Sequence, residues 1–268
     1  MTAAMPVMAP HQAQAIECFV AKYGGDDAFV ALLLVGSLAH GFATPASDVD
    51  VILVATEDEY RRRQGDGRLA FVERDLCGYA GGYVDCKVTA PSLLQRVADR
   101  GSDPARYAFE GATILSSREP ELGALLARIA RFPVEEKAAR ERRFLCQVLA
   151  WTWYMGQAEA HSDAYLTAVA TQKLALFACR VVLNRNEKLY PYHKWLVSET
   201  VRAPLQPEAF EACLNDLLGR PSLKAAQRLQ EAVLAFVGGA GDGLDWPLQF
   251  MVDSELNWLH HEAPIDDL

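Results

Sequence analysis

The sequence lacks the features that mark several common classes of protein. None of its six cysteines forms a Cys-x-x-Cys pair or a spacing typical of a zinc site, so we expect reduced thiols. Basic residues are not in excess: 26 Lys and Arg against 35 Asp and Glu give a net charge of −9, which argues against a nucleic-acid partner. Low-complexity tracts and convincing internal repeats are also missing. The 268 residues are therefore expected to form one large or two modest globular domains.

The sequence also lacks a recognisable targeting or membrane-spanning segment. Its start, Met1 to Pro6, has neither the basic head nor the long apolar body of a signal peptide. The apolar run from Ala28 to Val35 is far too short to cross a bilayer. We therefore expect a cytoplasmic protein with no membrane partner.

Two motifs of well-known nucleotide and ion sites are missing as well. After Gly36-x-x-x-x-Gly41, the Lys and Ser or Thr of a Walker phosphate loop are replaced by Phe42 and Ala43. Asp48-x-Asp50 is not followed by the oxygen ligand and glycine of a calcium loop, because Ile52 and Leu53 stand there.

The most informative stretch joins two apolar strands through a Gly-Ser turn. Phe29 to Val35 is an almost continuous aliphatic run, typical of a strand covered on both faces, and it stops at Gly36-Ser37. The second strand begins at Asp48-Val49-Asp50. Because side chains alternate along a strand, the two carboxylates share one face. Adjacent anionic groups repel each other, so we expect a cation between them.

The rest of the first half alternates helix and strand signals. We expect helices over 11–23, 57–77, 91–101 and 119–131, and a short strand over 112–115. The alternating strand 83–89 places Asp85 and Lys87 on one face. This alternation favours an α/β or α+β domain with a small mixed sheet.

The character of the sequence changes at Pro133. From there on, helix signals dominate, with long helices over 135–159 and 164–184 and shorter ones near Trp195, Phe210, Leu229 and Leu256. We therefore expect two domains, 1–132 and 133–268, the second an all-α helical bundle.

Taken together, Gly36-Ser37, Ser47-Asp48-Val49-Asp50 and the later Asp85 resemble the nucleotidyltransferase superfamily of the DNA polymerase β type. The resemblance implies transfer of a nucleoside monophosphate, AMP from ATP, to a hydroxyl group. It implies two Mg²⁺ ions held by Asp48, Asp50 and Asp85, with Asp85 also taking the acceptor's proton. It further implies that the nucleotide is bound by Gly36, Ser37, Ser47 and Lys87.

A second resemblance covers part of the helical half. Lys173 to Phe177 and the run Tyr190 to Leu196 are similar to the C-terminal domain of bacterial nucleotidyltransferases related to aminoglycoside-modifying enzymes. This implies a small-molecule acceptor selected by the helical domain, with Lys194 reaching the triphosphate. Lys194 beside Trp195 is equally typical of a snorkelling lysine beside a core tryptophan, and His40 is either a ligand contact or a surface histidine.

Two other functions remain open on the sequence. The chain is either an enzyme that adenylylates a protein partner, as in the antitoxin branch of the superfamily, or a catalytically silent nucleotide-binding module. The helical half disfavours the first, and the three carboxylates disfavour the second.

Overall fold

The computed structural model describes residues 8–239, 243–260 and 264–268 and divides the chain into two compact units. The sheet unit comprises Met1–Gly101 and Ala105–Arg131. The helical unit comprises Ser102–Pro104 and Phe132–Leu268. Phe132, near which the sequence predicts a boundary, begins the longer segment of the helical unit.

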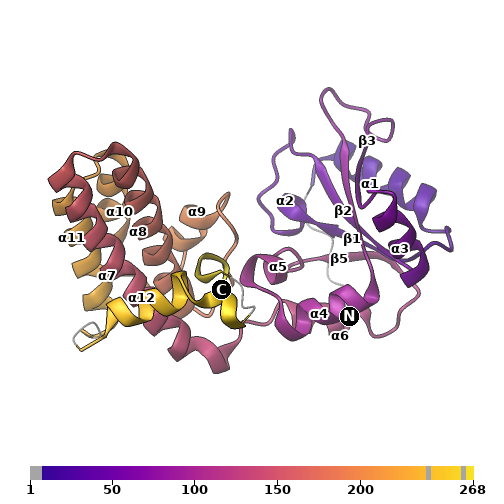
Figure 1. Cartoon of the computed structure of the whole chain (residues 1–268). Helices are drawn as coiled ribbons and strands as arrows, with labels where there is room; N and C mark the ends of the chain where they lie inside the picture. The colour runs from indigo at the N-terminus through magenta and orange to yellow at the C-terminus, as the bar shows by residue number, and fades with distance from the viewer. Residues whose placement is uncertain (1–7, 240–242, 261–263) are drawn as a thin grey trace. The chain divides into compact units, whose positions relative to one another are not determined.

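The sheet unit is built on a five-stranded mixed sheet in the order β3-β4-β2-β1-β5 (Figure 1). β2 and β4 run parallel, whereas the pairs β1–β2, β1–β5 and β3–β4 are antiparallel. The predicted α+β architecture with a small mixed sheet is confirmed. The strands are β1 (Phe29–Val35), β2 (Val49–Ala55), β3 (Ala70–Glu73), β4 (Val84–Thr89) and β5 (Thr113–Ser117).

Apolar side chains cover both faces of this sheet, which explains the continuous aliphatic runs of β1 and β2. On one face Leu34 and Val51 belong to a core with Phe19 of α1. On the other, Leu33 and Ile52 belong to a core with helices α4 and α6. The helices of this unit are α1 (Pro10–Tyr23), α2 (Gly36–Ala39), α3 (Glu57–Gly65), α4 (Pro91–Arg100) and α6 (Leu122–Ile129). A further helix, α5 (Asp103–Tyr107), begins in the segment that belongs to the helical unit.

The predicted helix over 57–77 is wrong in its second half. α3 ends at Gly65, Gly67 adopts a φ of +68°, and the chain turns into β3. β3 is a short edge strand whose residues pair with β4, for example Ala70 with Lys87. Glycine at a positive φ favours a turn over a continuing helix.

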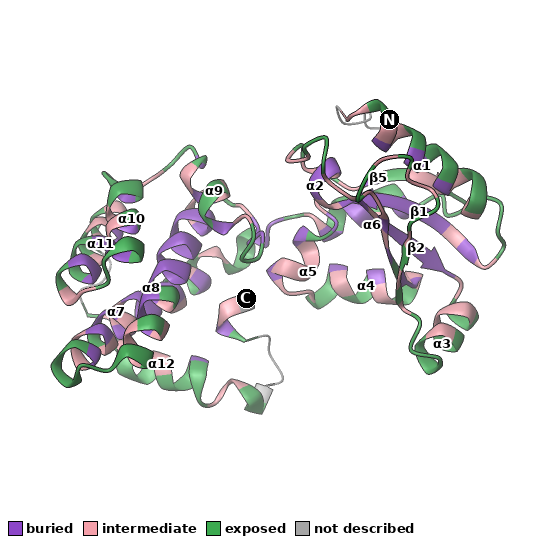
Figure 2. Cartoon of the chain, turned by 90° about the horizontal axis from the view of Figure 1, so that it is seen from above, coloured by how far each residue is buried: buried purple, intermediate pink, exposed green. Residues whose placement is uncertain are grey.

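The helical unit contains no strand among its described residues, and α8 forms its buried centre (Figure 2). α8 packs against α7, and its side chains Leu174, Phe177 and Val181 are fully buried. By length and composition α8 is apolar enough to cross a membrane, but 67% of that apolar window is buried inside the protein. The elements are η1 (Val134–Glu136), α7 (Lys137–His161), α8 (Ala164–Arg185), α9 (Leu196–Val201), α10 (Phe210–Gly219), α11 (Leu223–Phe236), α12 (Trp246–Ser254), η2 (Asn257–His260) and η3 (Ile265–Asp267).

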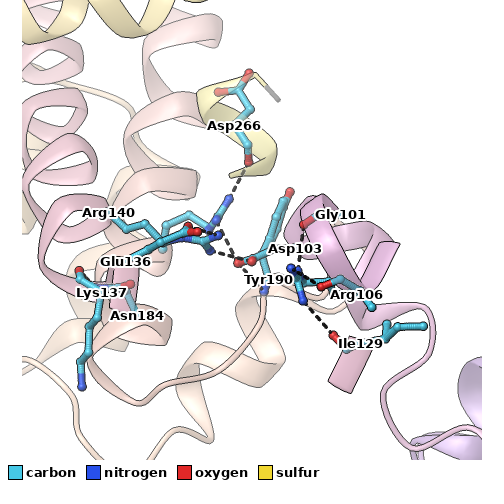
Figure 3. A network of polar contacts seen from close by, with 12 residues as sticks. Gly101, Asp103, Arg106, Ile129, Glu136, Lys137, Arg140, Asn184, Tyr190 and Asp266 are labelled. Atoms are coloured by element: carbon cyan, nitrogen blue, oxygen red, sulfur yellow. Dashed lines mark hydrogen bonds and ion pairs between the residues drawn. The ribbon is translucent and has the colours of Figure 1, made fainter. Parts of the chain in front are cut away.

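The short segment 102–104 is held in the helical unit by a buried carboxylate. Asp103 accepts hydrogen bonds from Arg140 Nη1 at 2.7 Å and from Arg180 Nη2 at 3.1 Å, and its carboxylate also accepts from the Tyr190 N–H at 3.2 Å (Figure 3). Arg180 itself lies between the rings of Phe144 and Tyr190. Charge pairing and ring contacts therefore offset the free-energy cost of burying these charged groups.

Candidate active site

The strand register brings two of the three predicted carboxylates side by side. Asp50 on β2 is the direct partner of Asp85 on the parallel strand β4. Neighbouring strands lie about 4.8 Å apart, and residues in register project to the same face. Asp48 directly precedes β2 and lies two residues before Asp50. The three carboxylates therefore gather where β2 and β4 begin.

The Gly36 turn lies directly against this group. β1 pairs with β2 so that Val35 is the partner of Asp50, and Gly36 follows with a φ of +68°. A Cβ added to Gly36 would lie 2.0 Å from Asp50 Oδ2, a distance that no side chain can adopt. Glycine is required here by both its backbone conformation and its lack of a side chain.

Ser37 supplies a buried polar atom at the same turn. The residue is only 7% exposed, and its Oγ has no hydrogen-bond partner within the described parts of the chain. A buried hydroxyl without a partner costs free energy, so such atoms call for a specific explanation. A ligand that approaches the start of α2 would supply the missing partner.

Two tyrosines that the sequence analysis missed lie beside the carboxylates. Interaction with the Asp48 carboxylate raises the pKa of Tyr83, and the charges of Asp85 and Asp50 raise it further. Burial raises the pKa of Tyr79, and the charge of Asp48 adds to this effect. All three carboxylates thus act on one hydroxyl. Strand alternation was the available signal, because Tyr83 lies two residues before Asp85.

Ser47 and Lys87 lie close to the carboxylates in sequence but have different surroundings. Ser47 Oγ accepts a hydrogen bond from the Thr44 N–H at 2.9 Å, so its hydroxyl closes the turn that leads into Asp48. Lys87 is exposed on β4, two residues after Asp85. Their contacts with a nucleotide stay predictions.

Lys194 belongs to the helical unit. It is exposed, its Nζ lies 5.2 Å from the centre of the Trp195 ring, and it lines a shallow groove of about 500 Å³ with His193 and Arg202. The expected contact between Lys194 and a triphosphate also stays a prediction.

The carboxylates suit magnesium by their chemistry. Among the described residues, no three His, Cys, Asp or Glu side chains are arranged to hold a metal ion. Mg²⁺ does not need such a cage, because proteins commonly bind it through one or two carboxylates together with substrate phosphates. The in-register pair Asp50 and Asp85 offers two carboxylates on adjacent strands. The residues therefore fit an ion that arrives with a nucleotide.

Comparison with known proteins agrees with the first resemblance. Residues 14–93, which include the Gly36 turn and all three carboxylates, match the family model of the nucleotidyltransferase domain. All of the matched residues lie in the sheet unit. A solved structure of a nucleotidyltransferase-like protein from Exiguobacterium sibiricum 255-15 is 13% identical, with a TM-score of 0.47, over 92% of this chain and 77% of that chain. No curated protein matches the chain.

Proposed function

We propose that the chain transfers AMP from ATP to a hydroxyl group of a small-molecule acceptor, with magnesium. The observation that carries this proposal is the pairing of Asp50 with Asp85 next to the Gly36 turn. A nucleotidyltransferase domain supports nucleotide transfer in general terms. The nucleotide, the acceptor and the metal are the proposed part.

In this proposal the residues at the start of β2 and β4 and in the Gly36 turn have different functions. Backbone N–H groups at Gly36 and Ser37 and the Ser37 hydroxyl bind the β and γ phosphates. The acceptor oxygen attacks the α phosphorus, the bond from that phosphorus to the bridging oxygen breaks, and pyrophosphate leaves. The acceptor's proton passes to the Asp85 carboxylate.

Asp50 and Asp85, which lie in register, would hold the magnesium together with the substrate phosphates, and Asp48 would add a further oxygen once the nucleotide is bound. When bound, the metal neutralises charge on the phosphates and on the attacking oxygen.

Calorimetric titration with ATP tests the proposal, using the whole chain with and without Mg²⁺. We expect magnesium-dependent binding, weakened at least about tenfold by Asp50→Asn or Asp85→Asn, because each change removes one charged oxygen ligand. Asp58→Asn is the matched control, since Asp58 is an exposed carboxylate on α3 that pairs with Arg61. Failure of the wild-type chain to bind ATP overturns the proposal. Equal binding by all variants indicates a catalytically silent module.

Incubation with a cell lysate and ATP labelled at the α phosphate tests the acceptor class. We expect label in small molecules from the wild-type chain and none from Asp85→Asn. Label in a protein band instead indicates adenylylation of a protein partner and overturns the small-molecule acceptor.

A further inference from the structure

His40 is bonded to the turn that the proposed function assigns to the triphosphate. It directly follows α2, and its Nδ1 lies 2.9 Å from the Gly36 carbonyl oxygen. Because a carbonyl oxygen only accepts hydrogen bonds, Nδ1 carries the proton. The backbone N–H of His40 donates to the same oxygen at 3.1 Å. His40 therefore donates two hydrogen bonds to the Gly36 carbonyl oxygen, one from its side chain and one from its backbone.

Aromatic rings fix the orientation of the imidazole. The ring of Tyr107, a residue that is only 5% exposed, stacks on His40 with a centroid distance of 4.4 Å and an interplanar angle of 19°. The ring of Phe42 is nearly parallel to the His40 ring as well, and the centroids of these two rings are 5.9 Å apart. A side chain whose ring plane is set by its neighbours is suited to orient another group.

Holding the Gly36 carbonyl also sets the direction of the next N–H group. In a planar trans peptide the carbonyl of Gly36 and the N–H of Ser37 point in opposite directions. The carbonyl points along α2 toward His40, so the Ser37 N–H points out of the start of the helix. That is the end at which Gly36 abuts Asp50.

We propose that His40 is a positioning residue that holds the Gly36–Ser37 peptide with its N–H directed at the phosphates of the bound nucleotide. The inference rests on the proposed function and adds a group that never contacts the substrate. A donor fixed in advance binds a phosphate more tightly than one that must first reorient.

Two variants separate the hydrogen bond from the ring contacts. His40→Phe keeps an aromatic ring that can contact Tyr107 and Phe42 but lacks the donor. His40→Asn lacks the ring but carries an amide N–H near the position of Nδ1. The control is His161→Phe, which alters an exposed histidine at the end of α7 in the helical unit.

Calorimetry with Mg²⁺ should compare ATP with AMP, which lacks the β and γ phosphates. We expect His40→Phe to weaken ATP binding about tenfold and to leave AMP binding within about twofold of the wild type. His40→Asn should recover most of the ATP affinity, and the control should not change it. Thermal melting of each variant shows whether it is folded.

Each outcome decides the inference. Wild-type ATP affinity in a folded His40→Phe overturns it and leaves the proposed function intact. Equal losses of ATP and AMP affinity, together with a lower melting temperature, show a purely structural histidine and also overturn it. A wild-type chain that does not bind ATP overturns the proposed function and this inference together.

Discussion

The carboxylates of the two units have opposite surroundings. In the helical unit, Asp103 is 2% exposed and pairs with Arg140 and Arg180. In the sheet unit, Asp85 lies in register with another carboxylate, and within the described parts of the chain it forms no ion pair. One acidic group is compensated by two cations, whereas the other lies among charges of its own sign.

This difference separates a structural from a functional role. A buried carboxylate persists only where cations and hydrogen-bond donors compensate its desolvation, as they do for Asp103. Gathered carboxylates repel each other and lower stability, so their retention indicates a use other than folding. The same residue type is thus a compensated charge in the helical unit and, in the proposed function, a ligand of the metal ion in the sheet unit.

Exchanging aspartate for asparagine in each unit should give the largest contrast. Asp103→Asn removes the buried charge that Arg140 and Arg180 share and should cost about 3 to 5 kcal/mol of unfolding free energy. Asp85→Asn relieves repulsion and should change it by less than about 0.5 kcal/mol. Guanidinium unfolding followed by tryptophan fluorescence measures the first effect, because all five tryptophans lie after residue 132, in the helical unit. Circular dichroism measures the second.

The contrast also predicts which variant loses activity. Asp85→Asn should lose AMP transfer while remaining folded, and Asp103→Asn should keep ATP binding at temperatures where it is folded. A fully stable Asp103→Asn variant would contradict the structural role that we assign to this carboxylate.

Two glycines test whether the position of the Asp50 carboxylate matters. Gly36 and Gly41 both have a positive φ, +68° and +73°, but only at Gly36 would a Cβ meet Asp50, since the space around Gly41 is open. Gly36→Ala should displace the carboxylate and weaken ATP binding and AMP transfer about 100-fold. Gly41→Ala should cost only about 1 kcal/mol of unfolding free energy through backbone strain. Equal binding losses in the two variants, measured by calorimetry, would contradict a specific contact at Gly36.

Local patterns were sufficient to predict the two strands, β1 and β2, beside which the carboxylates lie. The aliphatic runs of β1 and β2 predicted buried strands, and strand alternation placed Asp48 and Asp50 on one face. The pairing of Asp50 with Asp85 was implied only by the family resemblance, because a parallel register depends on how distant segments meet.

Features that depend on distant partners were missed. β3 was read as the end of a helix because a four-residue edge strand carries too few alternating positions to be recognised. The local sequence around Asp103 does not indicate that this carboxylate is buried and paired, because its partners Arg140 and Arg180 lie 37 and 77 residues further along the chain. His40 was left open because stacking on Tyr107 cannot be seen in the sequence.

A surface carboxylate of the sheet unit should give the smallest effect and complete the comparison. Hydrogen bonds from Arg62 and Arg63 lower the pKa of Glu59 from 4.5 to about 2. A lowered pKa in the folded state means that this pairing stabilises the protein above pH 4.5 and that the contribution is lost as the pH falls toward about 2. Because solvent screens surface pairs, Glu59→Gln should cost only about 1 kcal/mol at pH 7, and the difference from wild type should shrink below pH 4.5. Circular dichroism during urea unfolding at several pH values measures this difference, whereas the tryptophan transition should not move. A cost that persists unchanged at pH 3 would show that Glu59 acts through packing and not through its charge.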